Sequence, residues 1–74
     1  MPKLKVFSGN DLIKLFLENG FSYIRTKGSH SIVQKQFIDT TITIPISLHK
    51  ELKIGTLSSI IRQSKLPRDL FETN

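Results

Sequence analysis

The six residues Thr41-Ile42-Thr43-Ile44-Pro45-Ile46 decide the fold, because isoleucine alternates in them with threonine or proline. Successive side chains of a strand point to opposite faces, so this alternation predicts a strand with one buried isoleucine face. Proline lacks the N–H that a strand donates to its neighbour, and Pro45 therefore indicates a sheet edge or a position near the strand end.

Two further strands are predicted upstream of this segment. They cover residues 21–26 and 30–36, with Lys27-Gly28-Ser29 as the turn between them and residues 37–40 as the next connection. Strict alternation in the first of these strands would place Phe21, Tyr23 and Arg25 on one face.

Helices are predicted on both sides of the strands. Ser8 is a typical N-cap for the first helix, whose apolar stripe includes Leu12 and Phe16. Gly20 suits the left-handed position at the end of that helix, from which Phe21 can fold back on Phe16.

The second helix is predicted over residues 56–65, where leucine and isoleucine recur at helical spacing. Its apolar stripe consists of Leu57, Ile60 and Ile61. Pro67 suits the first turn of a last short helix, and Leu70 and Phe71 are expected to dock that helix on the core.

This order of elements predicts an α+β fold with the sequence α-β-β-β-α, as a single domain over residues 1–74. Both helices must bury their stripes, and one face of a three-stranded antiparallel sheet accommodates them. The opposite face is left to solvent or to a ligand.

The composition favours an anionic partner. Eleven Lys and Arg residues against six Asp and Glu give the 74-residue chain a net charge of +5. That charge suits RNA, DNA, an anionic membrane or an acidic protein. The chain has no cysteine, so a disulfide is excluded. No apolar run approaches a membrane span, and we expect a soluble, cytoplasmic protein without a membrane partner.

Two histidines, His30 and His49, are the side chains suited to proton transfer near neutral pH. The acidic residues are scattered along the chain without metal-binding spacing, so we expect neither a metal nor a small-molecule cofactor. Ser29 and His30 are neighbours and would point to opposite faces of a strand, which argues against a Ser–His nucleophile. If the chain is an enzyme, it is therefore a histidine enzyme without a metal.

The segment Lys27-Gly28-Ser29-His30 is the strongest candidate site. Turn amides and the Ser29 hydroxyl can bind a phosphate, Lys27 adds charge, and His30 begins a strand beside them. The alternative is an ordinary hairpin turn followed by a surface histidine.

A basic loop over residues 47–54 could lie beside this turn and extend the site. Its relevant side chains are His49, Lys50 and Lys53, and Arg25 could join them. A solvated basic face is the alternative. The phenylalanines are expected in the core rather than as stacking platforms for bases, with Tyr23 left open; they are Phe7, Phe16, Phe21, Phe37 and Phe71.

Several segments together resemble the HicA family of toxins from bacterial and archaeal toxin–antitoxin pairs. Residues 8–15 and Asn19-Gly20-Phe21 resemble the first helix of the family and its exit, and residues 27–30 resemble its most characteristic motif. Pro45, His49 and residues 51–57, leading to Ile60 and Ile61, resemble the segment that enters its second helix. The connection over residues 37–40 departs from the family, because it lacks the glycine-rich polar turn common in relatives.

The resemblance implies a fold like that of the double-stranded RNA-binding domain. It also implies a toxin that cleaves mRNA with His30 as the catalytic residue, and a neutralising antitoxin of the HicB type. In that setting Lys27, Gly28 and Ser29 would bind RNA, together with the loop residues His49, Lys50 and Lys53.

Two rival functions remain at this point. One is a non-catalytic module of the same fold that binds double-stranded RNA. Such modules usually carry a tight lysine cluster at the start of the second helix, where this chain has Gly55-Thr56-Leu57-Ser58. The other rival is a domain that binds an acidic protein.

Overall fold

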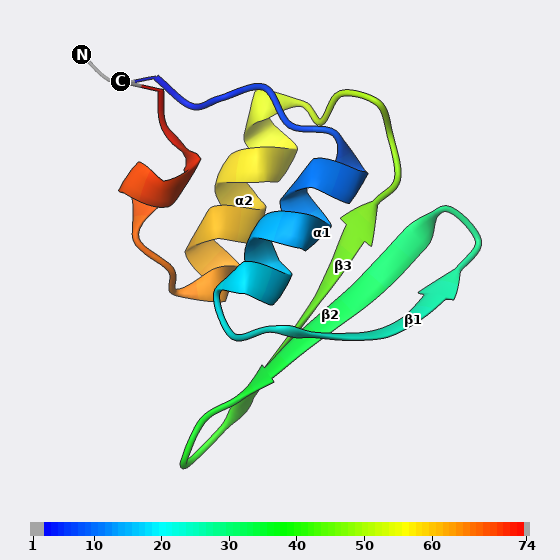
Figure 1. Ribbon diagram of the computed structural model, residues 1–74, viewed down its shortest axis with the longest axis vertical. Helices are drawn as coiled ribbons and strands as arrows, with labels where there is room; N and C mark the ends of the chain where they lie inside the picture. The colour runs from blue at the N-terminus through cyan, green and yellow to red at the C-terminus, as the bar shows by residue number, and fades with distance from the viewer. Residues whose placement is uncertain (1–2, 74) are drawn as a thin grey trace.

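Figure 1 shows the protein as a computed structural model, which describes residues 3–73. Residues 1–2 and 74, the ends of the expected single domain, lie outside the described residues. The elements in chain order are α1 (Gly9–Glu18), β1 (Ser22–Lys27), β2 (His30–Gln36), β3 (Thr41–Ser47), α2 (Ile54–Ser64) and the 3-10 helix η1 (Arg68–Phe71). The predicted α+β class and the α-β-β-β-α order are confirmed.

The three strands form one antiparallel sheet in the order β1-β2-β3. The β2–β3 pair runs without a break from His30 opposite Ser47 to Gln36 opposite Thr41. Pro45 lies on the edge strand β3, as its missing N–H predicts.

One face of the sheet carries the core. Ser31 and Val33 of β2 are buried, as are Ile44 and Ile46 of β3, which lie opposite Val33 and Ser31 respectively. Both helices pack on this face (Figure 1). Their buried apolar residues are Leu12, Phe16, Leu57, Ile60 and Ile61. Among the described residues, no helix covers the outer face of the sheet (Figure 1).

The first helix begins and ends where the sequence predicts. The backbone N–H of Asp11 donates to the Ser8 hydroxyl at 3.1 Å, which caps the helix. Gly20 has a φ of 94°, which a side chain would disfavour. The Phe16 and Phe21 rings lie 4.9 Å apart between centroids, so the chain turns back on the helix it has just left.

A bulge in β1 overturns the predicted alternation of that strand. Tyr23 lies opposite Val33 and Arg25 lies opposite Ile32, so the register shifts between them. Val33 is buried and Ile32 is on the outer face, which places Tyr23 and Arg25 on opposite faces of the sheet. The extra residue in the strand causes the change.

Three further expectations are corrected. Phe37 is 38% exposed and is not a core residue; it lies in the β2–β3 connection, with Lys35 Nζ 5.4 Å from the centroid of its ring. The second helix begins at Ile54 rather than at residue 56, with Lys53 as its N-cap. Pro67 is the N-cap of η1, one residue before its first turn.

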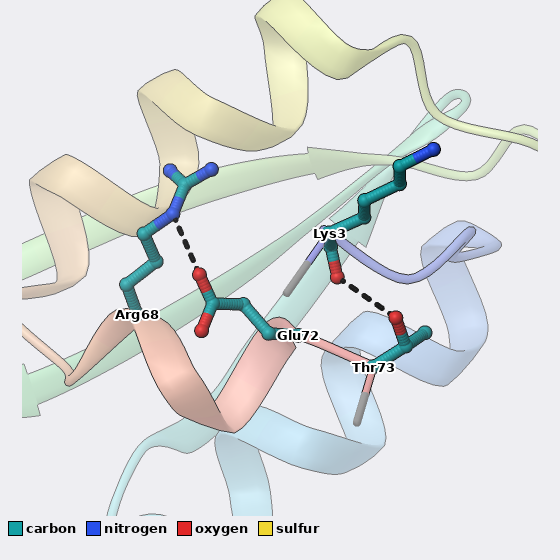
Figure 2. A network of polar contacts seen from close by, with 4 residues as sticks. All are labelled: Lys3, Arg68, Glu72 and Thr73. Atoms are coloured by element: carbon teal, nitrogen blue, oxygen red, sulfur yellow. Dashed lines mark hydrogen bonds and ion pairs between the residues drawn. The ribbon is translucent and has the colours of Figure 1, made fainter. Parts of the chain in front are cut away.

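The two ends of the described chain are joined (Figures 1 and 2). The N–H of Lys5 donates to the Phe71 carbonyl at 2.8 Å, and the N–H of Thr73 donates to the Lys3 carbonyl at 2.7 Å. Figure 2 shows the Thr73 hydroxyl, which donates to the same Lys3 carbonyl at 3.3 Å, and the Arg68–Glu72 ion pair on the η1 side of the junction. The junction holds Phe71 in the core, where its ring contacts those of Phe7 and Phe16.

Candidate functional site

The hairpin between β1 and β2 has a two-residue turn. Lys27 lies opposite His30, so Gly28 and Ser29 form the loop. Gly28 has a φ of 61°, whereas Ser29 is not among the residues with positive φ. This combination is typical of a type II′ turn, whose twist matches that of antiparallel strands. The turn predicted over residues 27–29 is confirmed at Gly28 and Ser29, whereas Lys27 belongs to β1. The turn fixes Lys27 and His30 side by side.

His30 and Lys27 both lie on the outer face of the sheet. Ser31 is buried on the inner face, so its neighbour His30 points outward, and residues directly opposite each other share a face. Ser47 lies opposite His30 on the other side. The His30 side chain is therefore exposed, between Lys27 and Ser47, at the end of the sheet.

The loop after β3 is bound to this hairpin by its backbone. The N–H of Leu48 donates to the Ser29 carbonyl at 2.7 Å. A second bond links the loop to α1, because the N–H of Gly9 donates to the His49 carbonyl at 2.9 Å. The loop thus joins the candidate hairpin to the first turn of α1.

Glycine is required at position 9 by this close approach. A Cβ atom there would overlap the Ser47 carbonyl oxygen and lie 2.9 Å from the Leu48 Cα. Both neighbours are backbone atoms, which a side-chain rotation cannot move. The absence of a side chain at Gly9 therefore sets the position of the loop that carries His49.

The basic residues of the loop surround a cavity of about 510 Å³. Its lining residues are Ser47, His49, Lys50, Glu51, Leu52, Lys53 and Thr56. A second cavity of about 610 Å³ lies along α2 and shares Lys53 and Thr56 with the first. The loop residues predicted to bind RNA are thus brought together around one hollow.

The predicted site residues consequently form two groups. Lys27, Gly28, Ser29 and His30 make up the hairpin, and His30 lines neither cavity. The other group consists of His49, Lys50 and Lys53 around the loop. The Leu48–Ser29 hydrogen bond joins the two groups.

Sequence reasoning missed two residues of this region. Ser47 lies opposite His30 and also lines the loop cavity, and Thr56 lines both cavities. Ser47 follows Pro45 by two residues and therefore points to the same outer face. Extending the predicted strand by one residue would have identified Ser47. The position of Thr56 beside both cavities could be predicted only from the correct start of α2.

Within residues 3–73, no group of three or more His, Cys, Asp or Glu residues lies together as a metal site would require. In the same part of the chain, no helix has the length and apolar character needed to cross a bilayer. The chemistry available at this end of the sheet is that of two exposed imidazoles, lysine ammonium groups, the Glu51 carboxylate, hydroxyls and turn amides.

The fold and this region define a small α+β domain with histidines and lysines gathered at one end of its sheet. The model of a protein family, the HicA toxin of bacterial toxin–antitoxin, matches residues 9–66. The chain belongs to the HicA toxin family. It is therefore a toxin of the toxin–antitoxin type, which implies an antitoxin as partner. No curated protein and no solved structure matches the chain.

Proposed function

We propose that the protein is a metal-independent endoribonuclease that cleaves mRNA in the cytoplasm, with His30 as its catalytic residue. The position of His30 supports this proposal. Its exposed imidazole lies between Lys27 and Ser47, at the end of the sheet where the loop of His49 is bound to the hairpin.

RNA supplies its own nucleophile, the 2′-OH. That hydroxyl gives its proton to a base and forms a 2′-O–P bond, while the bond between phosphorus and the 5′ oxygen breaks and the leaving oxygen takes a proton. The products are a 2′,3′-cyclic phosphate and a 5′-hydroxyl. No metal or redox partner enters this balance.

His30 acts in this reaction as the acid or the base. Lys27 and the backbone amides of the Gly28-Ser29 turn hold the phosphate, whose negative charge rises in the transition state. His49 or a water molecule can serve the other proton transfer, since the Leu48–Ser29 bond keeps the loop beside the hairpin.

The loop residues His49, Lys50 and Lys53 bind the RNA outside the reacting phosphate. They surround the hollow beside the hairpin, where ammonium groups attract phosphates. Glu51 lines the same hollow, so the potential there is mixed rather than uniformly positive.

The test is cleavage of a labelled single-stranded RNA in EDTA by the wild type and by His30→Ala. Loss of an acid–base group costs about 10²- to 10⁴-fold in rate. His30 is exposed, so the variant should keep its thermal stability. An RNA with one 2′-deoxy nucleotide at the cut site should resist cleavage.

The control is Lys14→Ala, which removes one exposed charge from α1 and should leave the rate unchanged. Wild-type rates in folded His30→Ala would disprove the assignment. Binding of double-stranded RNA without any cleavage would instead favour the non-catalytic module.

The antitoxin in this proposal is an acidic protein of the HicB type that covers His30. The basic end of the sheet attracts such a partner and speeds its association in a salt-dependent way. Covering the hairpin excludes RNA without distorting the toxin.

A further inference from the structure

We propose that the outer face of the sheet is the binding track for the single-stranded RNA next to the scissile phosphate. The inference deepens the proposed function and rests on it. It assigns phosphate binding to Arg25, apolar contact with a base to Ile32 and Pro45, and base selection to Gln34.

The strand register defines which side chains share this face. Residues directly opposite each other lie on the same side of a sheet, and the buried residues identify the inner side. Three successive rows therefore point outward, namely Lys27–His30–Ser47, Arg25–Ile32–Pro45 and Ser22–Gln34–Thr43. The row that contains His30 lies at one end of the track.

The charge of the sheet fits a polyanion. Arg25 and Lys27 lie on the outer face, and the three strands contain no Asp or Glu. Lys35, the third basic residue of the strands, lies on the inner face beside the Phe21 ring. All six carboxylates of the chain lie outside the sheet, at Asp11, Glu18, Asp39, Glu51, Asp69 and Glu72. A phosphate backbone that crosses the outer face meets no acidic side chain of a strand. Arg25 and Lys27 both belong to β1 and place positive charge along one border of the track.

An apolar platform lies one row from the catalytic residue. Ile32 is two residues from His30 along β2, or about 7 Å. Pro45 lies directly opposite Ile32, and the bulge in β1 places Arg25 on its other side. In other RNA-binding domains, aromatic side chains on the open face of a sheet hold unstacked bases. Ile32 and Pro45 are not aromatic, and they offer a base an apolar contact surface instead. A base adjacent to the cut site can therefore rest on Ile32 and Pro45 while its phosphate meets Arg25.

The third row can select the base. The Gln34 side-chain amide donates to the Thr43 hydroxyl at 2.9 Å. This bond orients the amide, so its carbonyl oxygen is presented as an acceptor to a base edge. An oriented amide recognises hydrogen-bonding patterns, which an apolar platform does not.

The experiment measures RNA binding in the His30→Ala background, so that no substrate is consumed, and cleavage in the otherwise wild-type chain. The probe is a single-stranded RNA of mixed sequence that contains the cut site. Arg25→Ala should weaken binding roughly three- to tenfold and lower the salt dependence by about one counterion. The matched control Lys14→Ala removes the same charge from a helix and should change neither quantity.

Gln34→Ala provides the second readout, because a base-selecting residue changes preference rather than overall affinity. Its cleavage pattern along the RNA should differ from that of the wild type, whereas Arg25→Ala should slow all sites alike. Thermal unfolding confirms that each variant is folded.

Two outcomes would overturn the inference. One is binding by Arg25→Ala equal to that of Lys14→Ala, which would place the RNA away from the outer face. The other is an unchanged cleavage pattern in Gln34→Ala. Failure of the wild type to cleave any RNA would refute the proposed activity instead, and the binding measurements would still test the track.

Discussion

Replacement of Gly9 by alanine tests how the fold positions the loop of His49. Gly9 is the buried first residue of α1, and an added Cβ would overlap the Ser47 carbonyl oxygen. The backbone must move to relieve that overlap. The movement would strain the bond between the Gly9 N–H and the His49 carbonyl, which is 2.9 Å long.

The expected cost follows from two opposing effects. Overpacking in a well-packed region costs about 1–3 kcal/mol, and a lost hydrogen bond adds about 0.5–1.5 kcal/mol. Alanine favours a helix over glycine by about 1 kcal/mol at most. The net loss of stability is therefore about 0.5–3.5 kcal/mol, and each kcal/mol lowers Tm by about 4–8 °C in a domain of this size.

Gly55→Ala is the matched control. Gly55 also lies in the first turn of its helix, α2, and a Cβ there would meet no atom within 4 Å. Helix propensity alone should act at this position and raise the stability by up to about 1 kcal/mol. The midpoints of thermal and urea unfolding should therefore fall in Gly9→Ala and rise in Gly55→Ala.

Activity gives a second readout of the same perturbation. Below its Tm, Gly9→Ala should cleave RNA more slowly than Gly55→Ala, because the displaced loop also carries the Leu48–Ser29 bond to the hairpin. A Gly9→Ala protein as stable and as active as the Gly55→Ala protein would refute the close approach as the determinant of the loop position.

Three further predictions concern the proposed activity. In single-turnover measurements, the cleavage rate of His49→Ala should stay at least about tenfold above that of His30→Ala, because His49 lies in the loop and not in the hairpin. Equal losses of rate would indicate two catalytic histidines. Cleavage should persist in EDTA and fall as salt rises from about 50 to 200 mM, and a requirement for added magnesium would contradict the chemistry. An acidic antitoxin should protect His30 from chemical modification in the complex, and an inactive complex with His30 still reactive would point to inhibition at a distance.

Most of the fold could be predicted from local patterns. The isoleucine alternation in residues 41–46 identified the edge strand, and Ser8 and Gly20 marked both ends of α1 because each satisfies a backbone requirement that few residues meet. The bulge in β1 could not be predicted in this way. An extra residue in one strand depends on its partner, and no residue in 22–27 is a glycine that would mark it.

The hairpin turn of the candidate site was predictable from the sequence, but the arrangement of the hairpin with the loop was not. The hairpin residues Lys27 to His30 are contiguous, so the sequence alone identified their turn. The junction of the hairpin with the loop depends on two backbone bonds and on the space at Gly9. Such long-range backbone contacts leave no periodic pattern in a sequence.

Folding alone does not explain the charge of the sheet. Burial on the inner face requires apolar side chains at Val33, Ile44 and Ile46. The outward positions require only side chains that tolerate water, and a mixture of positive and negative charges would meet that requirement. Arg25 and Lys27 instead lie two residues apart on the same face, without a carboxylate in any strand. Two like charges about 7 Å apart repel by about 0.6 kcal/mol in water at low salt. A bound polyanion removes that repulsion and stabilises the folded chain by mass action. The proposed RNA strand on the outer face of the sheet would therefore account for a charge pattern that is unfavourable in the free protein.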